Sequence, residues 1–218
     1  MRIGLLGGTF DPIHWGHIEL AVLALRLAVL EVVYLVTAAI PPHKILGTEA
    51  SYPDRHAMVS LAVMNQSKLI PSSLEFDRDG KSYSIDTIQQ LKKLSGKSSE
   101  VFFIMGLDSF FDITSWKDFN LLPQLCRFLI VSRPGSHKNQ LKLKLPQDFL
   151  NDIYVIGDEN GSVLQMNQRF LLYPKFSNPL SSTDIRKRIG EGKEVSSELP
   201  PAVNEYITKN CLYKSASI

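Results

Sequence analysis

Cysteine is scarce in this chain, which has 218 residues and only two cysteines, Cys126 and Cys211. Two thiols exclude a framework of several disulfides and a zinc site made of four cysteines. Isolated free thiols are typical of proteins in a reducing compartment, so we expect a cytoplasmic protein. The apolar run that opens the chain stops at Gly7-Gly8. It is too short for a secretory signal, and none is predicted.

An excess of charge of one sign is also lacking, because 24 Lys and Arg face 22 Asp and Glu, mixed along the chain. No basic stripe with interleaved aromatics occurs, so we expect no nucleic-acid partner. The long apolar stretch at residues 20–40 contains Arg26 and Glu31. Each would cost about 3 kcal/mol at the centre of a bilayer. A helix followed by a β-branched strand explains this stretch better than a membrane span does, and no membrane partner is expected.

Two well-known phosphate motifs are absent, since neither the GxGxxG nor the GxxxxGK[ST] spacing occurs. No cluster of His, Cys and Asp has metal-site spacing, so the position of any metal stays unknown. The hydrophobic content of 44% is nevertheless ordinary for a chain that folds around a core. The sequence therefore predicts a globular protein whose chemistry comes from other motifs.

Strand and helix patterns alternate along most of the chain. This alternation favours an α/β fold, Rossmann-like and doubly wound, with a mostly parallel sheet and C-terminal helices. We expect a single domain over residues 1–218, in which residues 181–218 form a helical closing segment. Strands are predicted at Arg2–Leu6, Val32–Thr37, Leu69–Phe76, Val101–Met105, Arg127–Val131 and within Val163–Tyr173; helices are predicted at Gly16–Leu30, Asp54–Gln66, Ile85–Leu94, Ser181–Ile189 and Pro201–Asn210, with a shorter one after Asp108.

The most informative stretch lies between the first strand and the first helix. It runs Gly7-Gly8-Thr9-Phe10 and, after three residues, His14-Trp15-Gly16-His17. A glycine-rich turn at a helix start gathers backbone N–H groups and the positive helix end at one spot, which suits a phosphate. Two histidines three residues apart would meet the same phosphate.

A second motif reads Ser181-Ser182-Thr183-Asp184-Ile185-Arg186. Ser182 or Thr183 can cap a helix, which is by itself a structural role. Arg186 lies one turn further on, and helical side chains tilt back toward the N-terminus. Hydroxyls, free N–H groups and a guanidinium can therefore converge on one anion.

These two motifs resemble the HxGH and SSTxIR signatures of the nucleotidyltransferase superfamily. Further strings narrow the resemblance to bacterial-type nicotinate-nucleotide adenylyltransferases. They occur in family order over nearly the whole chain: Pro41-Pro42-His43-Lys44, Tyr83-Ser84-Ile85-Asp86-Thr87, Phe103 to Ser109, Trp116-Lys117, Ser132-Arg133-Pro134-Gly135 and Pro200 to Tyr213. Ser84 stands where the family usually has threonine, and Leu107 where alanine is usual.

The resemblance implies adenylyl transfer from ATP to nicotinate mononucleotide, which gives nicotinic acid adenine dinucleotide and pyrophosphate. His14, His17 and Arg186 are then the catalytic candidates. Mg²⁺ is the implied cofactor. The implied ATP-binding residues are Gly7, Gly8, Thr9, Phe10, Gly16, Lys44, Gly106, Asp108, Arg133, Ser182 and Thr183; those for nicotinate mononucleotide are Tyr83, Ser84, Trp116 and Lys117.

Alternatives stay open at this point. The chain could be another transferase of the superfamily, such as a pantetheine-phosphate adenylyltransferase or a cytidylyltransferase, or a nucleotide sensor without catalysis. The segments around Trp116 and Tyr83 argue against the first, and the presence of both His17 and Arg186 argues against the second. Whether the chain forms a homo-oligomer is not encoded in any pattern found.

Overall fold

The computed structural model describes residues 1–218 except 43–46, 97, 133–143, 158–166 and 215–218. Its centre is a seven-stranded sheet in the order β3-β2-β1-β4-β5-β7-β6. All six strand pairings are parallel. The strands are β1 (Arg2–Gly8), β2 (Val32–Thr37), β3 (Leu69–Ser72), β4 (Glu100–Gly106), β5 (Arg127–Val131), β6 (Ile153–Val155) and β7 (Phe170–Tyr173).

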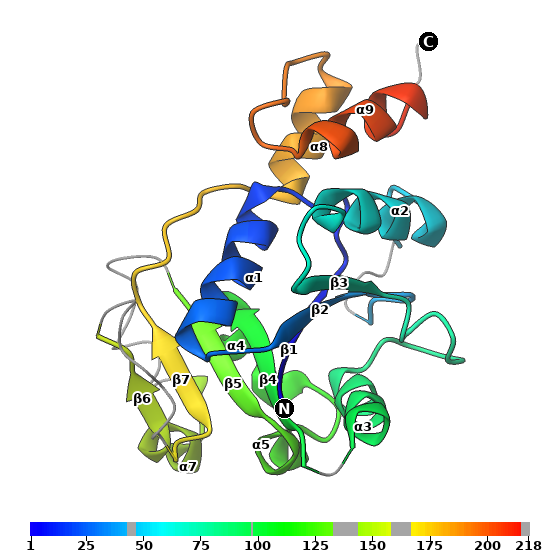
Figure 1. Cartoon of the computed structure of the whole chain (residues 1–218). Coiled ribbons are helices and arrows are strands. Elements are labelled where there is room, and N and C mark those ends of the chain that lie inside the picture. The colour runs from blue at the N-terminus through cyan, green and yellow to red at the C-terminus, as the bar shows by residue number, and fades with distance from the viewer. Residues whose placement is uncertain (43–46, 97, 133–143, 158–166, 215–218) are drawn as a thin grey trace.

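Helices cover both faces of the sheet, and two of them lie beyond the carboxyl ends of the strands (Figure 1). These two, α8 and α9, are the predicted closing helices, and α9 packs against α2. The helices are α1 (Trp15–Leu27), α2 (Tyr52–Val63), α3 (Ser84–Ser95), α4 (Leu107–Phe111), α5 (Leu122–Leu125), α7 (Gln147–Asn151), α8 (Ser182–Gly190) and α9 (Pro201–Lys209), with 3-10 turns at Ile113–Ser115 and Phe119–Leu121.

The alternation of side chains along each strand divides the core into two layers. In β1, Leu6 packs into the cluster shared with α1, α2 and α9. Its neighbour Leu5 packs into the opposite cluster, with α3 and α4. Both faces of the sheet are therefore buried, which explains why the strands are apolar almost throughout. The predicted α/β, doubly wound fold is confirmed.

Some predicted boundaries were wrong. The third strand was expected to reach Phe76 but ends at Ser72, since the backbone N–H of Phe76 donates to the Ser73 carbonyl in a turn. The second helix begins before Asp54, because the Ser51 hydroxyl accepts the Asp54 N–H and caps it. Strand β6 was missed, since three residues are too few to show a period. The expected strand in Val163–Tyr173 is confirmed at β7, while residues 163–166 lie outside the described residues.

Candidate functional site

A cleft of about 530 Å³ opens beyond the carboxyl ends of β1 and β4. These two strands are neighbours although they are far apart in the chain, so the winding reverses between them. Parallel sheets bind ligands at such a switch point. The cleft is lined by Thr9, Phe10, Asp11, His14, Gly16, His17, Leu20, Asp108, Ser109, Phe176, Asn178, Leu180, Ser181, Ser182, Thr183 and Arg186.

Two glycines shape the loop between β1 and α1. A Cβ at Gly8 would lie 2.8 Å from the Phe10 ring, which folds back under the loop. A Cβ at Gly16 would lie 2.7 Å from the side-chain oxygen of Asn178. Asn178 comes from the segment before α8, where it accepts the Leu180 N–H and donates to Glu19. Gly16 therefore lets the start of α1 and the approach to α8 lie against each other.

His14 and His17 lie with their rings stacked, 3.8 Å between centroids. The backbone N–H of His14 donates to Nδ1 of His17 over 3.3 Å. In a neutral ring that accepts at Nδ1, the proton sits on Nε2, so His17 offers an N–H donor at its other end. Burial lowers the pKa of His14 to about 4. Burial, and then the proximity of His14, holds the pKa of His17 well below its usual value. Both imidazoles are neutral donors at pH 7.

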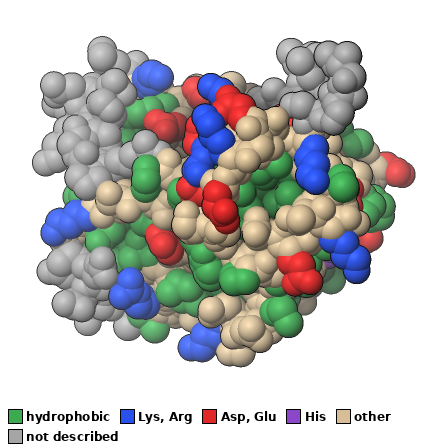
Figure 2. Space-filling model, turned by 90° about the horizontal axis from the view of Figure 1, so that it is seen from above, with side chains coloured by type: hydrophobic (Ala, Val, Ile, Leu, Met, Phe, Trp, Pro, Cys, Tyr) green, Lys and Arg blue, Asp and Glu red, His purple; other side chains and the backbone are tan. Residues whose placement is uncertain are grey.

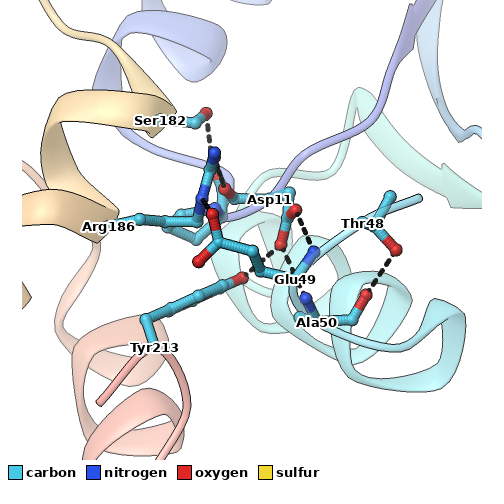
Figure 3. Close-up of polar contacts among 8 residues, drawn as sticks. Asp11, Thr48, Glu49, Ala50, Ser182, Arg186 and Tyr213 are labelled. Carbon is cyan, nitrogen blue, oxygen red and sulfur yellow. Dashed lines mark hydrogen bonds and ion pairs between the residues drawn. The ribbon is translucent and has the colours of Figure 1, made fainter. Parts of the chain in front are cut away.

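Arg186 reaches from the first turns of α8 to the loop after β1 (Figure 3). Its Nη1 donates to the Asp11 carbonyl over 2.8 Å, and its Nε pairs with the Glu49 carboxylate at 2.6 Å. The Ser182 hydroxyl donates to the Pro12 carbonyl. The helix start predicted to grip phosphate is thus fixed to the histidine loop by its own side chains.

Asp11 anchors three separate segments of the chain (Figure 3). Its buried carboxylate accepts the backbone N–H groups of Glu49 and Ala50 and, at 2.8 Å, the hydroxyl of Tyr213. Arg55 is also buried, and its Nη1 donates to the carbonyls of Thr9 and Ala38. A buried charge with several partners holds its surroundings in one geometry. Asp11 and Arg55 therefore hold the loops around the cleft in place.

A second, smaller pocket of about 120 Å³ lies where α3 begins. Trp116 forms one wall and meets Phe103 of β4 edge to face, with 5.7 Å between ring centroids. Ser84, the first residue of α3, brings its hydroxyl and the positive helix end to the same space. Its lining is Pro42, Ser82, Tyr83, Ser84, Ser115, Trp116 and Lys117.

The structure brings together most of the residues singled out in the sequence. The large cleft collects nine of them: Thr9, Phe10, His14, Gly16, His17, Asp108, Ser182, Thr183 and Arg186. The small pocket collects all four residues predicted for nicotinate mononucleotide. Gly7 and Gly8 end β1 and Gly106 ends β4, and none of the three lines the cleft. Lys44 and Arg133 lie outside the described residues.

Acidic and basic side chains lie interspersed on the face of the molecule that is seen from above (Figure 2). Within the described residues, no group of three or more His, Cys, Asp or Glu side chains is arranged to hold a metal ion. None of the described helices is long and apolar enough to cross a membrane. Cys126 is buried, Cys211 is exposed, and both are free thiols.

Comparison with known proteins now gives the family. The model of the cytidylyltransferase-like family matches residues 5–188. A probable nicotinate-nucleotide adenylyltransferase of Geotalea daltonii is 37% identical over 98% of both chains. A probable nicotinate-nucleotide adenylyltransferase of Thermoanaerobacter is 35% identical over 98% of this chain and 95% of its own length. One of Thermus thermophilus is 36% identical over 98% of this chain and 100% of its own length. The chain belongs to the nicotinate-nucleotide adenylyltransferase family.

Solved structures agree with the fold of this family. The Plasmodium falciparum nicotinic acid mononucleotide adenylyltransferase complexed with NaAD aligns with a TM-score of 0.72 and 21% identity over 97% of both chains. The same Plasmodium enzyme complexed with APC aligns with a TM-score of 0.70. At this identity the likeness shows the shared fold alone. It supports the doubly wound arrangement in which the cleft lies.

Sequence reasoning missed several residues that shape this nicotinate-nucleotide adenylyltransferase site. Asp11 stands inside the first motif, so its place next to the histidines was a usable signal. The side chains of Glu49 and Asn178 bond to residues more than a hundred positions away, Arg186 and Glu19. Arg55 is a single basic residue in an ordinary helix. No local pattern distinguishes these three from surface residues.

Proposed function

We propose that this protein transfers the adenylyl group of ATP to nicotinate mononucleotide, a step of NAD biosynthesis. One observation carries the proposal: the switch-point cleft joins His14, His17 and Arg186, and a second pocket with a tryptophan wall lies by the start of α3. A phosphate oxygen of the mononucleotide attacks the α-phosphorus of ATP, and the bond to the β-phosphate breaks. The products are nicotinic acid adenine dinucleotide and pyrophosphate. The attacking phosphate is already an anion, so no general base is needed.

The histidines supply charge stabilisation in this proposal. Neutral His17 directs its Nε2–H away from the bond at Nδ1, as a donor for the α-phosphate. His14 is a second donor in the same stack. Donors that are fixed before the reaction stabilise the charge that develops in the transition state without reorganising. This fits phosphoryl-type transfer, in which positioning and electrostatics carry catalysis.

Arg186, Ser182 and Thr183 take the leaving pyrophosphate. They project from one helix start, whose free N–H groups add to their attraction for an anion. Thr9, Phe10 and Gly16 line the same cleft, and Asp108 at its edge suits the ribose hydroxyls. For Gly7, Gly8 and Gly106 we propose an indirect role, the shaping of the strand ends. Lys44 and Arg133 remain candidates for the phosphates and the adenine end.

A divalent metal ion fits this cleft as a companion of the nucleotide. We propose Mg²⁺, which usually binds through substrate phosphates, water and one or two carboxylates. The described lining offers donors for the phosphates through which such an ion would be held. When bound, the ion would neutralise charge on the triphosphate. The residues of the chain would still position both substrates.

The small pocket takes the pyridine ring. Trp116 and Tyr83 offer aromatic faces, while the Ser84 hydroxyl and the backbone N–H groups near Lys117 offer donors for the nicotinate carboxylate. Donors and a helix N-terminus favour an anion over a neutral amide. The partners of the protein are then ATP and nicotinate mononucleotide. A cytoplasmic location, one domain and the absence of a nucleic-acid partner stay predictions, and oligomeric state stays open.

The test is an assay of the protein with ATP and a panel of acceptors. Nicotinate mononucleotide, nicotinamide mononucleotide and 4′-phosphopantetheine are supplied in turn, pyrophosphate is measured, and the products are identified by mass. We expect nicotinic acid adenine dinucleotide from the first acceptor, at a rate at least ~10-fold above that with the second. Turnover with phosphopantetheine would move the protein to another branch of the superfamily. ATP binding without turnover on any acceptor would indicate a nucleotide sensor.

A further inference from the structure

An ion pair bounds the small pocket, between α3 and the turn that carries Trp116. The Lys117 ammonium lies 3.1 Å and 3.0 Å from the two carboxylate oxygens of Asp86. The same Nζ lies 5.0 Å from the centroid of the Tyr83 ring, which is a cation–π distance. Lys117 is therefore held in place from two sides. It also lines the pocket, whereas Asp86 does not.

The two charges have opposite effects on an anion bound in the pocket. Asp86 occupies the first turn of α3, beside the helix end that would attract a substrate carboxylate. Its negative charge offsets that attraction. The Lys117 ammonium, which pairs with this carboxylate, offsets the repulsion. Removal of either charge would therefore leave the other one unbalanced beside the pocket.

We propose that the Lys117–Asp86 ion pair sets the charge preference of the small pocket and so determines how strongly a carboxylate-bearing pyridine nucleotide is favoured over its neutral amide analogue. This inference rests on the proposed function, because it assumes that the pyridine ring enters this pocket. Both residues act as specificity determinants by their charge, and neither takes part in the chemistry.

Substitution of the two residues should shift the ratio of kcat/KM for the two mononucleotides in opposite directions. Lys117→Met keeps the backbone N–H but leaves Asp86 unbalanced, so the ratio of kcat/KM for nicotinate over nicotinamide mononucleotide should fall. Asp86→Asn frees the ammonium, so the same ratio should rise. The side chains are 43% and 29% exposed, and solvent screening limits each shift to about three-fold. The double variant should return close to the parent ratio.

Two further variants test whether the charge at position 117, and not the net charge of the protein, sets the ratio. Lys117→Arg keeps the charge and should keep the ratio. Lys193→Met changes the net charge equally at an exposed ion pair with Glu191, beyond α8, and should leave the ratio unchanged. All five variants are measured with both mononucleotides at fixed, saturating ATP.

The outcomes separate this inference from the function on which it rests. A purely structural pair would lower kcat/KM for both mononucleotides in both single variants, with no opposite shift of the ratio. That result, with nicotinate mononucleotide still used by the parent, overturns the inference alone. If the parent turns over neither mononucleotide, the proposed function is overturned and the inference with it.

Discussion

In the proposed mechanism Arg186 binds the phosphates of ATP, and Glu49 competes with them for the guanidinium. Arg186 Nε pairs with the Glu49 carboxylate at 2.6 Å, while Nη1 is held by the Asp11 carbonyl. A phosphate that binds the same edge has to displace Glu49. We therefore expect Glu49→Gln, which removes a charge next to the cleft, to bind ATP more tightly than the parent.

The size of this effect follows from exposure. The side chain of Glu49 is 57% exposed, although that of Arg186 is only 13% exposed. Exposed ion pairs contribute about 0.2 to 1 kcal/mol. Loss of the competing pair should then tighten ATP binding by about 1.4-fold to 5-fold. Glutamine keeps a hydrogen-bond acceptor, so the position of Arg186 is preserved.

Titration calorimetry with ATP measures the difference directly. Glu31→Gln is the matched control: the side chain is 62% exposed and pairs with the N-terminal ammonium, so the net charge changes equally at the far end of the sheet. The control should bind ATP like the parent. The gain of Glu49→Gln should also shrink at about 0.5 M salt, since exposed charges are then screened. Equal or weaker ATP binding by Glu49→Gln would refute the competition and make Glu49 a support for Arg186.

Three more predictions follow from the same contacts. His17→Ala should lower kcat by about 10²-fold or more with a smaller change in ATP affinity, because its donor acts mainly on the transition state; stopped assays on the folded variant check this, and a near-parental kcat would exclude the role. Burial lowers the pKa of His14 from 6.5 to about 4, so the unfolded chain takes up the proton first as the pH falls. The contribution of neutral His14 to the free energy of unfolding is then fully present above pH 6.5, and about 3 kcal/mol of it is lost toward pH 4. In urea unfolding, the free energy of unfolding should depend less steeply on pH for His14→Gln than for the parent, and equal slopes would show that His14 is not the cause. Tyr213→Phe removes the 2.8 Å hydrogen bond to the buried Asp11 carboxylate and should cost about 1.5 to 3 kcal/mol; an unchanged Tm would show that the C-terminal segment is not held there.

The elements that could be predicted from the sequence are those whose structure is determined by residues close together in the chain. The strand–turn–helix from Arg2 to Leu27 follows from an apolar run, two glycines and a helical apolar face within 26 consecutive residues. The third strand was overestimated because Leu74 and Phe76 continue an apolar alternation that the Ser73 turn interrupts. In that case a turn hydrogen bond decided against the pattern. Strand β6 depends on its pairing with β7 and leaves almost no trace in three residues.

The residues of the site also fall into those that a local motif reveals and those that only long-range contacts bring in. His14, His17 and the Ser182–Arg186 helix start are each legible because one short motif contains both the ligand-facing groups and the backbone that presents them. The groups that join these motifs come from elsewhere, and each reaches across the fold: Tyr213 to Asp11, Glu49 to Arg186, Asn178 to Glu19. A single sequence carries no spacing signal for a contact between residues 137 to 202 positions apart.

The proposed mechanism depends on the relative position of two helix starts that long-range contacts hold together. The residues proposed to touch phosphate sit on two helix starts, α1 and α8, that are distant in the chain. Asp11 contributes to their relative position, because its carbonyl accepts from Arg186 and its carboxylate accepts from Glu49, Ala50 and Tyr213. A catalytic donor misplaced by about 1 Å can lose a large part of its effect. In the mechanism proposed, the buried Asp11 carboxylate touches none of the reacting atoms, but we expect its loss to impair adenylyl transfer by displacing the groups that hold the phosphates.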